Sequence, residues 1–229
     1  MIKLEHLKVF NLEGALRGMR NPMNSWERSD SFKADEGMSS RGADYVIGEA
    51  DMALAQSLVK SGSDHRKFMR QIFVSVDITA PLYWWKEFDT YKVGTVSNSC
   101  STMHKIADKE FTLDDFSHEH LTQFTETDSS GDVVVFDSVR WLRTTISQLN
   151  WAREMYLKTN DKKYWWQMIQ LLPSSYNQRR TITMDYENAL NMYNARKKHK
   201  LDEWRVFCEE LKKLPYFAEF ANLDKTKEK

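Results

Sequence analysis

The stretch IFVSVDITAPLYWWKEF, residues 72–88, decides the fold class because a strand pattern changes to a helix pattern at a proline. Apolar residues occupy every second position from Ile72 to Ile78, which is the period of a half-buried strand. Pro81 suits the first position of a helix, so we expect a helix through Phe88. A strand that leads directly into a helix indicates a mixed fold.

The segments before this stretch predict a strand, a loop and a helix. Residues 1–10 alternate loosely and predict an edge strand. Residues 20–43 are rich in Asn, Pro, Ser, Asp and Gly without a period, so we expect a long loop, either functional or a mobile flap. Asp44 is expected to cap a helix with apolar positions at residues 47–58. The Ser-Gly-Ser at residues 61–63 ends that helix.

The segments after this stretch are mostly helical. Residues 94–102 are polar, so they form either a solvated loop or a ligand cradle. A turn signal lies at residues 128–131. Further along the chain we expect helix 142–156, helix 164–172 ended by Pro173, strand 180–183, helix 186–200 and a last helix over residues 201–211. The whole pattern predicts an α+β fold.

Composition bounds the class of protein. The chain has 229 residues, and its 33 basic and 33 acidic side chains cancel, which excludes a broadly cationic nucleic-acid coat. No apolar run reaches membrane length, so we expect a cytoplasmic protein that binds neither nucleic acid nor membrane. We expect a single domain over residues 1–223 and a charged tail over residues 224–229.

Three residue groups are candidates for chemistry on residue types alone. His118 and His120 would need a strand and further ligands to bind a metal. Cys100 is either a nucleophile in the polar segment or an ordinary small residue in a turn. Cys208 lies on an apolar stripe and is expected in the core. Two cysteines cannot build a disulfide framework or a Cys-rich zinc site.

A basic cluster precedes the strand of residues 72–79. Arg66, Lys67 and Arg70 lie close together in sequence. With Lys92 and the pair at 179–180 they either gather around a phosphate or form a solvated helix face.

Several segments, in order, resemble the flavin-dependent thymidylate synthases. That family's motif is Arg-His-Arg, two residues, Ser, one residue, Asn-Glu, one residue, Ser, one residue, Arg-Tyr, after a helix that begins with Ala-Pro. Residues 80–92 match this run in spacing, and residues 95–104 are similar to the motif's tail with one inserted residue. Further similar segments are residues 14–20, Leu172-Pro173, Leu190 to Arg196, His199 and Trp204.

The resemblance implies a fold, an activity and an assembly. The fold would be α+β, an antiparallel sheet packed with helices. The activity would be reductive methylation of dUMP to dTMP with FAD, methylenetetrahydrofolate and NADPH in a homotetramer that binds FAD across subunits. The eight Trp and twelve Phe are then either interface residues or an aromatic-rich core.

The resemblance also implies site residues. Arg196 would polarise the uracil ring as the catalytic residue. The pyrimidine nucleotide would contact Glu87, Ser101 and Arg196. The flavin would contact Thr90, Tyr91, Lys92, Asn98 and Asn191, and Arg66 and Arg70 would replace cofactor contacts that the motif lacks here.

Departures from the family motif leave two other functions open. Thr90, Tyr91 and Lys92 stand where the family has Arg-His-Arg, Glu87 stands where it has Gln, and Met103 stands where it has Arg. Each lost bidentate Arg–phosphate contact costs about 2 kcal/mol. The alternatives are altered pyrimidine-nucleotide chemistry on the same fold, or a flavin-free relative that binds a nucleotide or a protein.

Overall fold

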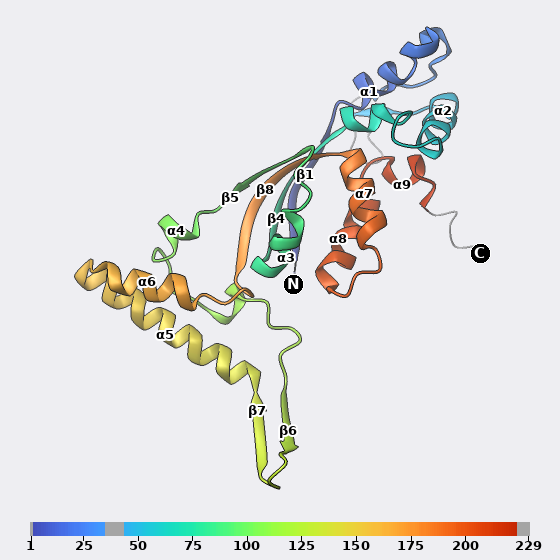
Figure 1. Ribbon diagram of the computed structural model, residues 1–229. Helices are drawn as coiled ribbons and strands as arrows, with labels where there is room; N and C mark the ends of the chain where they lie inside the picture. Colours follow the sequence, from blue (N-terminus) through green and yellow to red (C-terminus); the bar gives the residue numbers. More distant parts are fainter. Residues whose placement is uncertain (1, 35–43, 224–229) are drawn as a thin grey trace. The chain divides into compact units, whose positions relative to one another are not determined.

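The computed structural model describes residues 2–34 and 44–223, which form two compact units (Figure 1). The sheet unit contains the described residues of 2–78, 87–98 and 180–223, and the hairpin unit contains residues 79–86 and 99–179. The expected tail, residues 224–229, lies outside the described residues, as does the part of the expected loop over residues 35–43.

Four strands form the main sheet in the order β1-β4-β8-β5. Their bounds are Lys3–Phe10 for β1, Thr95–Ser99 for β5, Phe73–Pro81 for β4 and Asn177–Asp185 for β8. Every second residue of β4 from position 74 is buried, as the alternation predicts. The mixed architecture confirms the predicted α+β fold, and β1 is the expected edge strand.

The polar segment over residues 94–102 is mostly a strand, which neither expected form anticipated. β5 lies at the edge of the sheet, and an edge strand tolerates polar side chains on its solvated side. Gly94 precedes it with a positive φ of 74°, and a Cβ there would overlap the side chains of Asn188 and Asp185. Glycine is therefore required for the close approach of this turn to the neighbouring helix.

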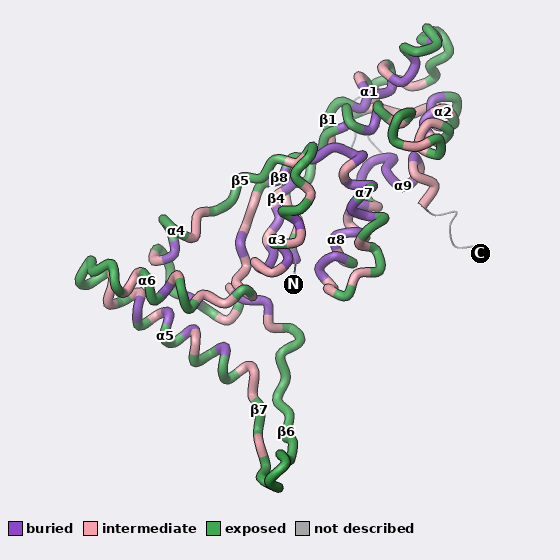
Figure 2. The backbone as a smooth tube through the Cα atoms, in the orientation of Figure 1, coloured by how far each residue is buried: buried purple, intermediate pink, exposed green. Residues whose placement is uncertain are grey.

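Helices complete the sheet unit. They are α1 (Leu12–Met19), α2 (Glu49–Lys60), α7 (Tyr186–Arg196), α8 (Asp202–Lys212), α9 (Phe217–Phe220) and the short 3-10 helices η1 (Asn21–Met23), η2 (Trp26–Arg28) and η3 (Lys67–Gln71). The side chains of α7 and α8 that face the core are buried (Figure 2). α7 ends at Arg196, four residues before the expected end. Among the described residues, no helix combines the length and apolar content that crossing a bilayer requires.

The predicted start of α2 is wrong, because its cap comes from a distant residue. Instead of starting a helix at Asp44, the chain first forms β3 (Tyr45–Val46), which pairs with β2 (Phe32–Lys33). The carboxylate of Asp30 then accepts hydrogen bonds from the backbone N–H groups of Ala50 and Asp51, at 2.8 and 3.0 Å. This satisfies two helix N–H groups that have no partner within α2.

The hairpin unit is built around two helices and a projecting β-hairpin (Figure 1). Its elements are α4 (Thr102–Lys105), η4 (Leu113–Asp115), β6 (Gln123–Thr127), β7 (Val133–Asp137), α5 (Ser138–Thr159) and α6 (Lys162–Leu171), and α3 (Leu82–Phe88) begins in it. The apolar stripe that predicted α5 is buried against α6. The strands β6 and β7 were not predicted, although the turn between them was.

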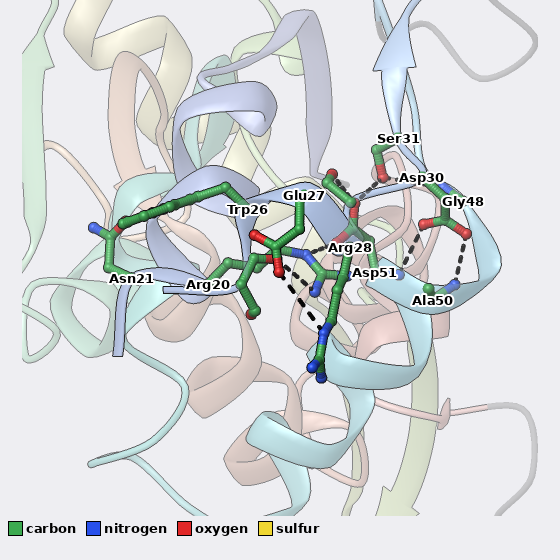
Figure 3. A network of polar contacts seen from close by, with 12 residues as sticks. Arg20, Asn21, Trp26, Glu27, Arg28, Asp30, Ser31, Gly48, Ala50 and Asp51 are labelled. Atoms are coloured by element: carbon green, nitrogen blue, oxygen red, sulfur yellow. Dashed lines mark hydrogen bonds and ion pairs between the residues drawn. The ribbon is translucent and has the colours of Figure 1, made fainter. Parts of the chain in front are cut away.

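A buried ion pair organises the segment between α1 and α2 (Figure 3). Arg20 donates from Nε to Asp51 Oδ1 at 2.6 Å, and their side chains are 5% and 0% exposed. The other carboxylate oxygen of Asp51 accepts from the hydroxyls of Ser29 and Ser31, at 2.6 and 2.5 Å. Two 3-10 helices and a strand therefore replace much of the featureless loop expected here.

Replacing Asp51 is expected to destabilise the protein strongly. Asp51→Ala leaves the buried guanidinium of Arg20 without a counter-charge, which costs about 3–5 kcal/mol. Urea unfolding followed by circular dichroism measures the loss, and the exposed Glu49→Ala is the matched control in the same helix. A loss below about 1 kcal/mol, the range of an exposed ion pair, contradicts this account of the segment.

Candidate functional site

Two strand-to-helix transitions position the candidate site in the sheet unit. β4 is followed directly by α3, whose last turn carries Glu87, and β8 is followed directly by α7, which ends at Arg196. The carboxylate of Asp185 caps α7 by accepting from the backbone N–H of Asn188 at 2.8 Å. The sequence brings these residues together although more than a hundred positions separate Glu87 from Arg196.

One oxygen of Glu87 is the centre of the site. Glu87 Oε2 accepts hydrogen bonds from Arg196 Nη1 at 2.7 Å and from Trp204 Nε1 at 3.0 Å. The buried indole of Trp204 thereby satisfies its only donor. Glu87 and Arg196 retain 35% and 20% of their side-chain exposure, so this ion pair borders solvent.

Arg196 is held on three sides and still offers donors. Its Nε donates to the hydroxyl of Tyr91 at 2.9 Å. The guanidinium carbon lies 4.9 Å from the ring centroid of Trp204 and 5.6 Å from that of Tyr91, within cation–π range. Two N–H groups are used in these contacts, so the remaining ones on Nη1 and Nη2 can bind a planar ligand edge.

The ring of His199 lies close to the same carboxylate. The backbone N–H of Leu201 donates to His199 Nδ1 at 3.2 Å, so Nδ1 is the acceptor nitrogen of the ring. The ring proton of the neutral form is then on Nε2, which lies 3.4 Å from Glu87 Oε2. Glu87 thus accepts from one indole N–H and one guanidinium, and the ring of His199 lies 3.4 Å from the same oxygen.

A second cluster gathers around Glu187 on α7. Arg66 Nε donates to Glu187 Oε1 at 2.9 Å, and Arg70 Nε donates to Oε2. Arg66 also donates from Nη2 to the side-chain oxygen of Asn191 at 3.2 Å. Burial favours a higher pKa for Glu187, but the hydrogen bonds from Arg70 and Arg66 outweigh it and hold its pKa below the ordinary 4.5. Two arginines and one carboxylate leave a net charge of +1.

A pocket of about 340 Å³ in the sheet unit borders the Glu87–Arg196 pair through Tyr91, which lies in its lining. Its lining includes Tyr91, Lys92 and Thr95, three residues of the segment that follows α3. Asp89, also in its lining, binds Arg180 Nη1 at 2.7 Å. Lys92 is exposed, and it forms no ion pair with the residues that the structure describes.

The expected phosphate cluster is divided between several places. Arg66 and Arg70 lie on Glu187, while Arg180 lies on Asp89. Arg179 lines a pocket of the hairpin unit instead, because successive residues of a strand point to opposite faces.

Two other expected flavin residues occupy exposed positions. Thr90 donates its hydroxyl to the backbone oxygen of Glu87 at 2.7 Å and follows the end of α3. Asn98 is exposed on β5. These contacts place Thr90 beside Glu87.

Ser101 belongs to the hairpin unit. Its hydroxyl oxygen accepts from the backbone N–H of His104 and caps α4. Ser101 and Cys100 line a pocket of about 470 Å³. Asn177, in the same lining, has a buried Oδ1 with no hydrogen-bond partner among the described residues. Cys100 is exposed, and Met103 is 49% exposed.

The weaker candidates have structural explanations. His118 lies outside any helix, and its Nδ1 contacts the backbone oxygen of Phe116 at 2.8 Å. Within the described ranges no group of three metal-ligating side chains occurs. Cys208 is buried, as predicted, and burial raises the pKa of its thiol to about 12.

Sequence reasoning missed three side chains of the site. Trp204 and His199 were noticed only as parts of a pattern, without a role. Glu187 precedes Asn191 by one helical turn on α7, so the helix period places both on one face. That spacing was the available signal for Glu187, whereas no local pattern links Trp204 to Glu87.

Solved structures similar to this chain span nearly its full length. Thymidylate synthase X from Helicobacter pylori, solved with FAD and dUMP, superposes with a TM-score of 0.62 at 15% identity and covers 99% of this chain and 98% of its own. The UMP/dUMP methylase PolB from Streptomyces cacaoi, bound with 5-Br dUMP, superposes with a TM-score of 0.58 at 14% identity, over 98% and 95%. The fold is that of the flavin-dependent thymidylate synthases.

Sequence comparison alone does not reach this likeness. No protein-family model matches the chain, and no curated protein matches it. The chain therefore has the thymidylate synthase X fold, and residues 80–104 differ from that family's motif at the positions named above. Of these, Glu87 and Tyr91 now hold Arg196, through its Nη1 and Nε.

The sheet unit offers excess positive charge to an FAD pyrophosphate at two separate places. The pyrophosphate is doubly anionic, and the cluster of Arg66, Arg70 and Glu187 carries +1. Lys92 supplies a second positive charge at the pocket. Arg180 and Arg196 contribute little net charge, because Asp89 and Glu87 neutralise them.

The pKa of Glu187 predicts how stability depends on pH. Its folded pKa is below the ordinary 4.5, so the stabilisation is complete above pH 4.5 and is lost as pH falls through the folded value. We expect the melting temperature of Glu187→Gln to be lower than that of the wild type at neutral pH and to fall less steeply below pH 4.5. Parallel melting curves against pH contradict a charged Glu187 between the two arginines.

Proposed function

We propose that this chain is a flavoprotein of nucleotide metabolism that methylates dUMP to dTMP with FAD, methylenetetrahydrofolate and NADPH, as a homotetramer. The observation that carries the proposal is the presentation of Arg196. Its planar guanidinium is fixed by Glu87, Tyr91 and Trp204 and retains N–H donors at the surface of the sheet unit. A fixed fork of donors recognises the oxygens of a uracil ring better than a flexible ammonium does.

The similar structures support the ligand classes. Thymidylate synthase X of the same fold was solved with FAD and dUMP, and the methylase was solved with a brominated dUMP. A pyrimidine nucleotide and FAD are therefore the first ligands to test on this chain.

Each side chain has a definite role in this proposal. Arg196 binds and polarises the uracil ring, and Glu87 and Tyr91 orient the guanidinium. Lys92 and the Arg66–Arg70–Glu187 cluster hold the FAD pyrophosphate, with Asn191 beside Arg66. Thr90 and Asn98 border the cofactor, and Ser101 contacts the nucleotide. FAD supplies the hydride and one-carbon transfer chemistry when bound.

One observation favours a second candidate function. Glu87 places a carboxylate on Arg196, where the family has a neutral glutamine. An anionic group of a ligand near this pair meets repulsion as well as attraction. The second candidate is thus a relative with altered pyrimidine-nucleotide chemistry, or a flavin-free protein that binds another ligand in the old site.

The flavin spectrum and a conservative variant test the proposal. We expect purified protein, or protein given FAD, to show flavin absorbance near stoichiometric occupancy. We expect Arg196→Lys to weaken dUMP binding at least about tenfold, or about 1.4 kcal/mol, because lysine offers a point charge in place of a fork. Calorimetry measures this affinity.

The control is Arg28→Lys, since Arg28 is exposed in the sheet unit and its ion pair is with the adjacent Glu27. It should leave dUMP affinity unchanged. If the purified protein is colourless and does not bind added FAD, both flavin-dependent functions, dUMP methylation and altered pyrimidine-nucleotide chemistry, are excluded. If Arg196→Lys binds dUMP as tightly as the wild type, Arg196 is not the nucleotide-binding residue.

A further inference from the structure

The β6–β7 hairpin exposes apolar side chains on both of its faces. Every residue of β6 is exposed, and Val133 and Val135 of β7 are 68% and 55% exposed. Phe124 and Phe136 are cross-strand partners whose rings stack at 4.9 Å, and both remain more than 40% exposed. A two-stranded hairpin alone in water is only marginally stable, so this one needs a covering surface.

The α5–α6 pair exposes a matching aromatic surface in the same unit. Trp141 and Trp151 of α5 are 72% and 53% exposed, and Trp166 of α6 is 44% exposed. Trp151 packs edge-on against Tyr164 at 5.6 Å, so the exposed rings of the two helices adjoin. Exposed tryptophans of this kind are enriched at protein interfaces.

The two surfaces carry opposite charge. The hairpin, residues 123–137, has no Lys or Arg, and its four acids are Glu126, Asp128, Asp132 and Asp137. The helix pair, residues 138–171, has two acids, Glu154 and Asp161. Its six cations are Arg140, Arg143, Arg153, Lys158, Lys162 and Lys163. Arg153 is half-buried and donates to the backbone oxygens of Ala107 and Asp108, which leaves side-chain charges of −4 and +3 on two electrostatically complementary surfaces.

Within one chain the hairpin does not cover the α5–α6 surface, and the direct junction between β7 and α5 explains why. β7 ends at Asp137 and α5 begins at Ser138, so no linker allows the hairpin to fold back along α5. Figures 1 and 2 show the hairpin extending beyond the helix, green along most of its length. A second copy of the chain presents the same helix pair without this restriction.

We propose that the β6–β7 hairpin of one copy docks on the α5–α6 surface of a second copy, and the second hairpin docks on the first copy in return. Such a reciprocal contact is the usual arrangement of a two-fold dimer. The stacked phenylalanines bury against the tryptophans, and Glu126, which shares a face of the hairpin with Phe124, faces the cations of the helices.

A charge exchange tests the pairing in the full chain. Variant A carries Glu126→Lys and Asp132→Lys, and variant B carries Arg143→Glu and Lys158→Glu. Asp128 and Asp137 stay because they cap the turn and α5. In sedimentation equilibrium, each variant alone should self-associate at least tenfold more weakly than the wild type. An equimolar mixture of A and B should associate more tightly than either variant alone, since one of its two contacts pairs the unchanged hairpin of B with the unchanged helix pair of A.

The matched control exchanges two exposed acids of the sheet unit, Glu27→Lys and Glu209→Lys, and should self-associate like the wild type. Unchanged melting temperatures for A and B show that both fold. A strictly monomeric wild type at micromolar concentration overturns the proposal. The proposal is also overturned if A and B each self-associate as tightly as the wild type, or if their mixture associates no more tightly than either variant alone. A monomeric wild type also contradicts the proposed homotetramer, whereas the results of A, B and their mixture concern this interface alone and need neither flavin nor nucleotide.

Discussion

A single carboxylate oxygen, Glu87 Oε2, joins three segments of the sheet unit. It accepts from Arg196 at the end of α7 and from Trp204 on α8, and it lies 3.4 Å from His199 between them. The Trp204 ring is buried, so its N–H needs this acceptor, and an unmet buried donor costs about 1–3 kcal/mol. The same contact that stabilises the helix ends therefore fixes the guanidinium that the site presents.

Most other cations around the site are also paired with a carboxylate. Arg66 and Arg70 share Glu187, and Arg180 pairs with Asp89. An anionic ligand has to compete with these carboxylates, so the affinity available from each arginine is smaller than its charge alone implies. The net charge that remains, on the Glu187 cluster and on Lys92, limits how much negative charge a ligand can bring.

The sequence pattern predicted the helices and strands that show a regular hydrophobic period along the chain. The alternation over residues 72–79 and the stripe of α5 were visible because strand and helix periods repeat along the sequence. The cap of α2 was missed because Asp30 acts from twenty residues upstream. β5 was missed because a solvated edge strand lacks the alternation of a buried one.

The candidate site was predictable in part for the same reason. The resemblance assigned Glu87 and Arg196 to the nucleotide and Tyr91 to the flavin, and the structure brings these three into contact. It did not show that Glu87 neutralises Arg196, because pairing depends on how the ends of α3 and α7 meet in space. The charge of a site is set by tertiary contacts that no single segment encodes.

The most direct test of the account is a double-mutant cycle between Glu87 and Arg196, read as the dUMP affinity of four proteins. The account predicts that Glu87→Gln tightens binding when Arg196 is present, because glutamine still accepts from Trp204 but no longer neutralises the guanidinium. It predicts no gain from Glu87→Gln in the Arg196→Met background, where no cation is left for Glu87 to neutralise, a coupling of the size found for contacting residues. Equal effects of Glu87→Gln in both backgrounds would contradict the claim that Glu87 and the nucleotide compete for Arg196.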